Sequence, residues 1–471
     1  MTDPPFEYSQ LPLHVGYLKK AAIDAFMKSR GYRLHRDTYD LSGPGEMISV
    51  TKPDTNGQGG GTVTINCFDA ATGAISSTTT DDSGVATFDG IRASIDAMLH
   101  GLDAIPDGSR LLGLSKTLQP LAGRLSTEFT QSLPGMMPAS DVSLDTDINH
   151  IQLDMQQYGW SGQYLEPFRH RVESLSAICG NMCRIVLFLD AIVQGEIGLF
   201  SRARDDVCQI VADVTSKYQA YAGQPEPDFS WRNVFEAASA FFTVVSLARG
   251  ISAIADGVGV GFDLLAKLMV TGEPTPAPQP VPDYAATTDA LATSLANLAT
   301  VTRTEDSAAT DAMYDLATFI ENASAGFFTW PPYSGDSADI PQVVVPPTEE
   351  EGRATVDNLR DIERILAEIA ESLINDPDPS AWTRPYPVGL FPSGPHAGWE
   401  AAQLALAKRI GSFSKDVRTT CSVLKQIIQD FTEADREAQR QMERIQEALD
   451  AAHNDPRDPK NHIRVPGHGS Y

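Results

Sequence analysis

The chain has 471 residues, with 62 acidic against 36 basic side chains and a formal net charge of −26. The length allows about two to four domains, and the charge argues against a dedicated nucleic-acid binder, whose affinity comes from basic side chains that neutralise phosphates. Apolar residues make up 42% of the chain, which excludes a wholly disordered protein. No run of ~18 uncharged apolar residues predicts an ordinary membrane-spanning helix, and the first ten residues do not resemble a signal peptide.

Residues 1–135 predict a mixed head of helices and short strands. Apolar residues at helical spacing predict a helix over 11–27. Alternation over 62–68 predicts a strand, and two shorter runs near Ile75 and Val85 complete a small three- or four-stranded meander. Such a meander is too small to stand alone, so we expect it to pack on helices.

The sequence offers no recognisable catalytic or metal-binding motif. The glycines at 59–61 lack the lysine of a phosphate-binding loop, so we interpret them as a flexible turn. Cys179 and Cys183 lack further ligands at metal-binding spacing, and we expect them to behave as small buried apolar residues. Asp205 and Asp206 are interpreted as a solvated helix face rather than as paired catalytic carboxylates. We therefore expect no enzymatic activity, no cofactor and no metal site.

Residues 136–271 carry the clearest pattern. Apolar residues predict a helix that begins near Asp141 and halts at Tyr158, and a second helix over about 163–222. In the second helix the apolar residues alternate in steps of three and four, the spacing of a coiled-coil seam. The seam includes Leu165, Phe168, Val172, Leu175, Met182, Val186 and Leu189. A helix of this length would extend ~90 Å, and it needs a second long helix, from this chain or another, to cover its seam.

The segment 231–270 is apolar and rich in small side chains, but charged residues interrupt it. Gly257, Gly259 and Gly261 follow a helical pattern rather than a strand, which argues against a dinucleotide-binding fingerprint. We interpret the segment as a helix buried in a bundle, and contact with a membrane surface is the alternative.

The second half of the chain predicts a proline-rich linker at 272–283, a helical region over 284–453 and a disordered tail over 454–471. The run Trp330-Pro-Pro-Tyr333 is interpreted as an inter-helix loop, with partner recognition as the alternative. The last helix, over about 399–452, keeps heptad-like apolar spacing. It would extend ~80 Å, so it is a candidate to pair with the central helix. The fold class predicted from these patterns is mainly α, an elongated bundle of long heptad-patterned helices with a small β meander near the N-terminus.

The unit of helix, Trp160-Ser161-Gly162 turn and helix resembles the WxG hairpin proteins secreted by type VII (ESX-type) systems of actinobacteria and related Gram-positive bacteria. In that family the turn joins two antiparallel helices, and a helical Tyr-x-x-x-Asp/Glu export signal follows the hairpin. The nearest match in this chain is Phe431-Thr-Glu-Ala-Asp435, with phenylalanine in place of tyrosine. The acidic, helical, cysteine-poor character and the proline-rich linker are similar to the larger PPE-type substrates.

The resemblance implies a non-enzymatic protein, secreted or at the cell surface by a route that needs no signal peptide, that assembles with a helical partner or with itself. It implies that Trp160 and Gly162 shape the hairpin tip and that Phe431 and Asp435 are recognised by the secretion ATPase. A cytoplasmic location is the alternative to export. Two other functions stay open: a secreted toxin or effector with a helical delivery module, and a structural helical protein of a phage or envelope assembly.

Overall fold

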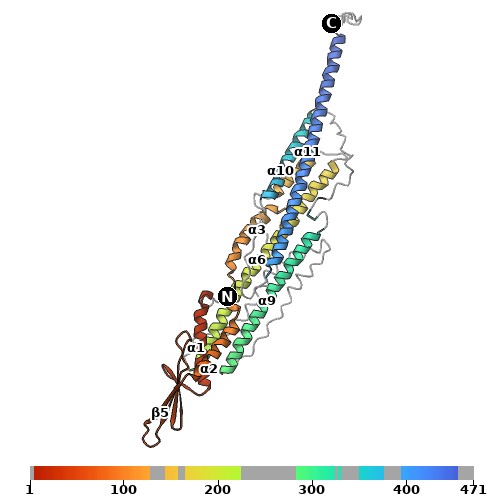
Figure 1. Cartoon of the computed structure of the whole chain (residues 1–471). Helices are drawn as coiled ribbons and strands as arrows, with labels where there is room; N and C mark the ends of the chain where they lie inside the picture. The colour runs from red at the N-terminus through yellow and green to blue at the C-terminus, as the bar shows by residue number, and fades with distance from the viewer. Residues whose placement is uncertain are drawn as a thin grey trace, which may run out of the picture.

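The computed structural model describes most of the chain, and every structural statement below concerns that part. The described residues are 5–127, 144–157, 165–223, 283–323, 327–328, 330, 349–375 and 394–453. They are mostly helical, with one antiparallel sheet near the N-terminus (Figure 1). This confirms the mainly α class and the presence of an N-terminal meander, although the meander has five strands rather than the three or four predicted.

The two longest described α-helices match predicted periodic segments closely. The predicted helix over 163–222 is α6, and the predicted last helix over 399–452 is α11. The eight described helices are α1 (Leu11–Ser29), α2 (Ser83–Leu99), α3 (Leu112–Leu125), α5 (Leu144–Gln157), α6 (Leu165–Tyr221), α9 (Tyr284–Asn322), α10 (Glu349–Asn375) and α11 (His396–His453).

The sheet has five strands in the order β1-β2-β3-β4-β5, each antiparallel to its neighbour. The strands are β1 (Arg33–Leu34), β2 (Thr38–Gly43), β3 (Glu46–Thr51), β4 (Val63–Phe68) and β5 (Ile75–Asp81). The sequence prediction found β4 and β5 but placed a third strand near Val85, which is wrong. Val85 lies in the first turn of α2, because the chain turns after β5, where Asp81 Oδ1 accepts a hydrogen bond of 2.8 Å from the Ser83 amide.

One hydrophobic core joins helices from both halves of the chain. It runs from Phe6 to Ile428 and includes buried residues of α1, α3, α6, α9, α10 and α11. A smaller cluster of Ile23, Met27, Tyr39, Val50 and Phe88 fixes the sheet to α1 and α2. The sheet therefore packs on helices, as predicted, and lies at one end of the molecule, while the last turns of α11 lie at the other (Figure 1).

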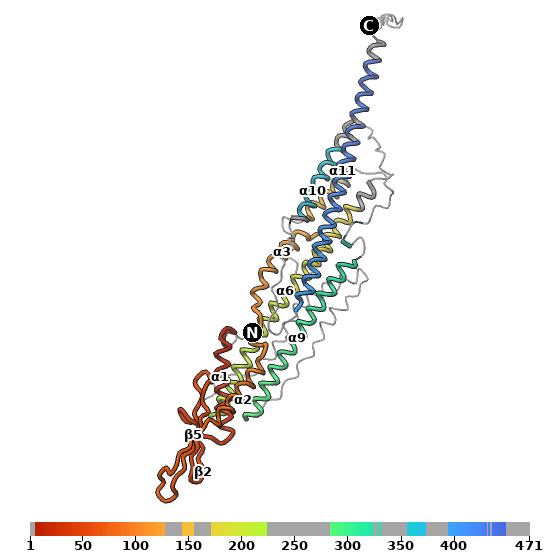
Figure 2. The backbone as a smooth tube through the Cα atoms, in the orientation of Figure 1, coloured from red at the N-terminus to blue at the C-terminus, as the bar shows by residue number. Residues whose placement is uncertain are grey.

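The two longest helices, α6 with 57 residues and α11 with 58, share only a short contact. Helix α6 packs mainly against α1, α3 and α9, whereas α11 packs mainly against α9 and α10 (Figure 2). At the contact, Arg171 Nη1 donates a hydrogen bond of 3.0 Å to Thr420 Oγ1. The suggested pairing of the two long helices is therefore limited, because shorter helices cover most of both seams.

Helix α6 also differs from the sequence expectation about membranes. The stretch Arg171–Tyr221 is long and apolar enough, by length and composition, to cross a bilayer. Within the fold, 61% of its most apolar window is buried. A core helix passes the same test, so the property gives a membrane-active role only weak support.

Candidate functional site

The structure describes only part of the residues that carry the family resemblance. Trp160 and Gly162 lie outside the described residues, between the end of α5 and the start of α6. Phe431 and Asp435 lie on α11 about one helical turn apart, but their side chains are outside the described part. The apolar segment 231–270 is also outside it, so its predicted membrane contact stays a prediction.

The predicted seam of α6 lies inside the protein wherever its side chains are described. Val172 is 1% exposed, and Leu175, Met182, Val186 and Leu189 are fully buried. Leu165 and Phe168 belong to the first turns of α6, and their side chains are not described. Because α1, α3 and α9 surround α6, this part of the seam is covered within the chain and is not available to a partner.

Trp330 joins α6 to α11. It is 5% exposed, and its ring packs at 5.5 Å from that of Phe413 on α11. Its indole Nε1 donates a hydrogen bond of 2.9 Å to the backbone oxygen of Arg171 on α6. The alternative of partner recognition by the Trp330-Pro-Pro-Tyr333 run is therefore wrong for its tryptophan, which is a core residue; the other three residues lie outside the described part.

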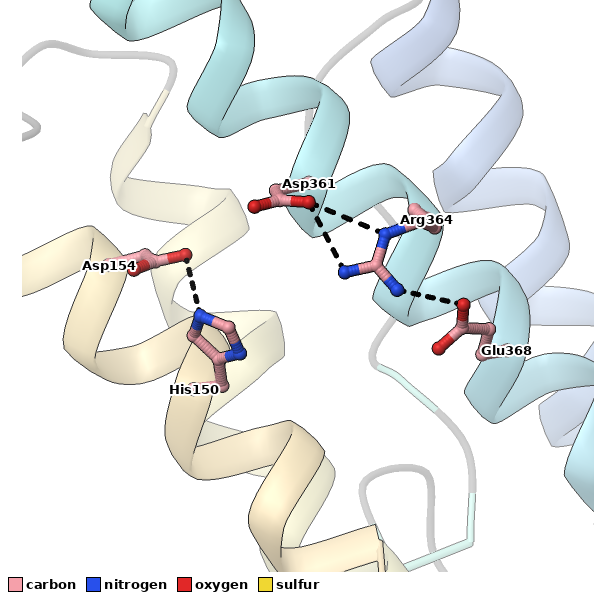
Figure 3. A network of polar contacts seen from close by, with 5 residues as sticks. All are labelled: His150, Asp154, Asp361, Arg364 and Glu368. Atoms are coloured by element: carbon pink, nitrogen blue, oxygen red, sulfur yellow. Dashed lines mark hydrogen bonds and ion pairs between the residues drawn. The ribbon is translucent and has the colours of Figure 1, made fainter.

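A charged network lies where α5 faces α10 (Figure 3). His150 Nε2 lies 3.5 Å from Asp154 Oδ2 on α5, and Arg364 on α10 contacts Asp361 at 3.2 Å and Glu368 at 2.8 Å. Nearby on α5, burial and then the charge of Glu368 raise the pKa of Asp147. The pairs drawn each lie within one helix, and all of their side chains except the half-buried Asp154 are solvent-exposed, so they support a hydrated face rather than a catalytic centre.

Three ionisable groups of α6 titrate closer to neutral pH than usual. Burial raises the pKa of Asp206 and of Asp213 to about 6, and burial lowers the pKa of Lys217 to about 8. Asp205 is exposed as predicted, but Asp206 is half-buried, so the interpretation of both as a solvated face is wrong for Asp206. Asp206 faces inward because it shares a helix face with the buried Ala203 and Ile210, three residues before it and four residues after it.

The cysteines behave as predicted for small apolar residues. Cys179 and Cys183 are both buried, and Cys183 Sγ donates to the Ala122 backbone oxygen at 3.2 Å. Burial raises the pKa of Cys179 to about 12, which keeps the thiol protonated and a poor metal ligand. Among the described residues, no group of three or more histidine, cysteine, aspartate or glutamate side chains is placed to hold a metal ion.

The glycine-rich loop before β4 is a fixed structural element. Arg92 of α2, 8% exposed, donates through Nε to the Gly57 carbonyl at 2.6 Å and through Nη2 to the Gly59 carbonyl. Glycines 59–61 all have positive φ, a conformation that glycine adopts at little cost. The predicted flexible turn is therefore wrong in one respect: buried hydrogen bonds hold this loop against α2.

Two exposed apolar residues lie one turn apart near the C-terminal end of α11. Met442 is 71% exposed and Ile445 is 57% exposed. Figure 1 shows this end of α11 extending beyond the other described helices. The same helix face is buried earlier, where Leu424 is 4% and Ile428 is 8% exposed. The apolar face of α11 therefore continues beyond the described helices that cover it, and such an uncovered face is suited to binding another helix.

Comparisons with protein-family models, curated proteins and solved structures find no match. The candidate site is therefore argued from the chain itself. Of the features above, only the distal face of α11 is apolar, exposed and part of a long helix.

Proposed function

We propose that this protein is a non-enzymatic helical component of a type VII secretion pathway, either a substrate or an associated partner, that acts through helix–helix assembly. The assembly unit is an elongated bundle of heptad-patterned helices. The observation that carries the proposal is the distal face of α11, where exposed Met442 and Ile445 continue a face that is buried at Leu424 and Ile428.

Two sequence features support the proposed export route: the tripeptide between α5 and α6, and a segment of α11 that follows them in the chain. The tripeptide Trp160-Ser161-Gly162 falls between α5 and α6, which contact each other. The segment Phe431–Asp435 lies on α11, after the hairpin in the chain. We propose that the secretion ATPase binds this segment and that the protein reaches the cell exterior or surface without a signal peptide.

Export from the native host tests this proposal. We expect Trp160→Ala combined with Asp435→Ala to abolish secretion while the protein still accumulates inside the cell. Glu433→Ala is the matched control, because Glu433 is an exposed carboxylate on the same turn of α11 and lies outside the Phe431 and Asp435 pair. Unchanged secretion of the double variant would show that the type VII assignment is wrong.

A second function has weaker support from one observation, the apolar stretch Arg171–Tyr221 of α6. Together with the apolar sequence of 231–270, it supports a secreted effector that inserts into a target membrane, with the other helices as a delivery module. Release of a dye from lipid vesicles tests this function. Vesicles that stay intact at every protein concentration argue against it, whatever the result of the export experiment.

A further inference from the structure

We propose that the distal end of α11 binds the same segment of a second copy in an antiparallel helix pair. The inference deepens the proposed assembly function and rests on it, and it shares only Asp435, at the end of the overlap, with the proposed export segment. The pair is centred between Met442 and Ile445, so that each of these residues packs against the other residue in the second copy.

The first argument is continuity with an interface that the protein already uses. Ser414 Oγ donates to the Ala370 carbonyl at 2.8 Å, and Lys425 Nζ contacts Glu363 at 3.0 Å, so α10 runs antiparallel to α11. Helix α10 begins at Glu349, and at this register it covers α11 no further than about residue 439. The apolar spacing of α11 continues beyond that point at Met442 and Ile445, where a second helix can take the place of α10.

The second argument concerns charge. The chain carries a net charge of −26, which opposes contact between two copies over most of the surface. The centre of the proposed pair is an exception: residues 439–448 carry two arginines and two glutamates and no net charge, and the additional acids Asp435 and Asp450 lie toward the ends of the overlap. These charged side chains lie away from the apolar face, as shown by Arg440 Nη1, which pairs within its own helix with Glu437 at 3.6 Å. Self-association at this segment therefore meets little repulsion.

The third argument separates a second copy from a different partner. In paired helices, the residues that flank the apolar face select the partner through their charges. Here the flanking positions are uncharged, at Gln439, Gln441, Gln446 and Ala448. Such flanks offer no charge pattern to an acidic or a basic partner, whereas an identical face matches itself about a two-fold axis.

The orientation follows from the heptad spacing of the sequence, in which Asp435 precedes Met442 by seven residues and so takes the same heptad position. A parallel pair in register would place two Asp435 residues side by side, and like charges at such a contact are unfavourable. The antiparallel pair centred at Met442 and Ile445 places Asp435 opposite Ala452, at the end of the overlap. It also points the acidic helical bundles of the two copies in opposite directions. Their separation then exceeds ~8 Å, the distance beyond which physiological salt screens most charge repulsion.

Sedimentation velocity of the full chain tests the proposal. Because an overlap of about two heptads is short, we expect a reversible dimer whose fraction rises with protein concentration. Met442→Glu should weaken the dimer by at least about tenfold, because it places a charge in the buried face. Leu404→Glu is the matched control, since Leu404 is also 71% exposed on α11, and it should leave the dimer unchanged. Circular dichroism checks that both variants stay helical.

The orientation is tested by a spin label at Glu433→Cys in a Cys67→Ser background, since Cys67 is the one cysteine that is not buried. The antiparallel pair separates the two labels by about 21 residues, or ~30 Å at 1.5 Å per residue. The proposal is wrong if the protein is a monomer at every concentration, which would also be the result if another segment covered this face. It is also wrong if the dimer persists in the Met442→Glu variant. A label separation typical of a parallel pair overturns the antiparallel arrangement. If the protein is a monomer and is still exported, the self-association alone is wrong. If the protein dimerises and the Trp160→Ala, Asp435→Ala double variant is exported as well as the wild type, the secretion assignment alone is wrong.

Discussion

The indole Nε1 of Trp330 donates a hydrogen bond of 2.9 Å to the backbone oxygen of Arg171, and the Arg171 guanidinium lies 5.2 Å from the centre of the same ring. Arg171 also donates to Thr420 on α11. Trp330 and Arg171 thus link α6 to α11 at the place where the two long helices meet. The contact joins residues 159 positions apart in the sequence.

Replacing Trp330 with alanine should destabilise the protein by about 3–5 kcal/mol, because it leaves a large cavity between α6 and α11. Trp330→Phe keeps most of the packing and loses the indole donor, so it should cost less, on the order of 1–2 kcal/mol. Urea unfolding followed by circular dichroism measures both. Leu404→Ala, at a site 71% exposed, should leave the midpoint in place. Equal effects of the alanine substitutions at Trp330 and Leu404 would contradict the structural role of Trp330.

The glycine-rich loop gives a second prediction, based on two glycines with similar backbone conformation. Gly57 has φ +71°, and a Cβ there would lie 2.7 Å from the Gly16 carbonyl oxygen. Gly73 has φ +67°, and a Cβ there would meet nothing within 4 Å. Both alanine variants carry the cost of a left-handed conformation, about 1 kcal/mol, but only Gly57→Ala also forces the loop away from α1.

Hydrogen exchange distinguishes the two variants. In Gly57→Ala we expect faster exchange at β3 and β4, because the loop that joins these strands no longer docks on α1 and α2. In Gly73→Ala we expect faster exchange only at the turn between β4 and β5. Identical exchange in the two variants would mean that the docking contacts of the loop do not hold the sheet.

The long helices could be predicted because their signal is local and repeated. The prediction of 163–222 for α6 differs from the observed Leu165–Tyr221 by two residues or fewer at either end. The sequence prediction did not include β1 to β3. β1 has only two residues, and the adjacent apolar Met47 and Ile48 break the alternation of β3. β2 does alternate, with Tyr39 and Leu41 against Asp40 and Ser42, but over a single run of six residues. Their pairing depends on contacts with β4 and on Tyr39, which is buried against Phe88 at 6.1 Å.

The sequence did not predict which helices pack against each other. An apolar seam requires a cover but does not specify it, so the equal lengths of α6 and α11 suggested a pairing that the structure limits to one short contact. The burial of Trp330 could not be predicted either, because its partners Arg171 and Phe413 are distant in sequence. For the distal face of α11, by contrast, the heptad-like spacing through Met442 and Ile445 was already visible.

The cysteines provide a direct check of the packing. Four of the five, Cys179, Cys183, Cys208 and Cys421, are buried, and Cys67 on β4 is half-buried. Burial raises the pKa of Cys208 to about 12 and of Cys421 to about 11, and a protonated thiol reacts slowly. In the native protein we expect an alkylating reagent to modify Cys67 first, and the other four only after unfolding. Mass spectrometry of the modified peptides measures the order, and early modification of Cys179 would contradict the core of α6.

The last prediction concerns pH and Asp213, which is 4% exposed and accepts a hydrogen bond of 2.9 Å from Gln209. Burial raises its pKa to about 6, above the ~4 of an unfolded aspartate. The folded state therefore binds more protons than the unfolded state between these values. The contribution of Asp213 to the free energy of unfolding accordingly rises as the pH falls from 7 toward 4, and the charged form is destabilising at neutral pH.

Asp213→Asn should remove this neutral-pH penalty and raise the free energy of unfolding at pH 7 by at most about 3 kcal/mol. The gain is reduced because the charge of Asp213 raises the pKa of the neighbouring Lys217, which burial lowers, and the variant loses that attraction. At pH 4.5 the variant and the wild type should differ little, since Asp213 is then protonated in the fold. Urea unfolding at both pH values measures the difference, with Asp311→Asn, at an exposed position of α9, as the control. A variant that is less stable than the wild type at pH 7 would mean that the carboxylate of Asp213 has a stabilising partner that outweighs its burial.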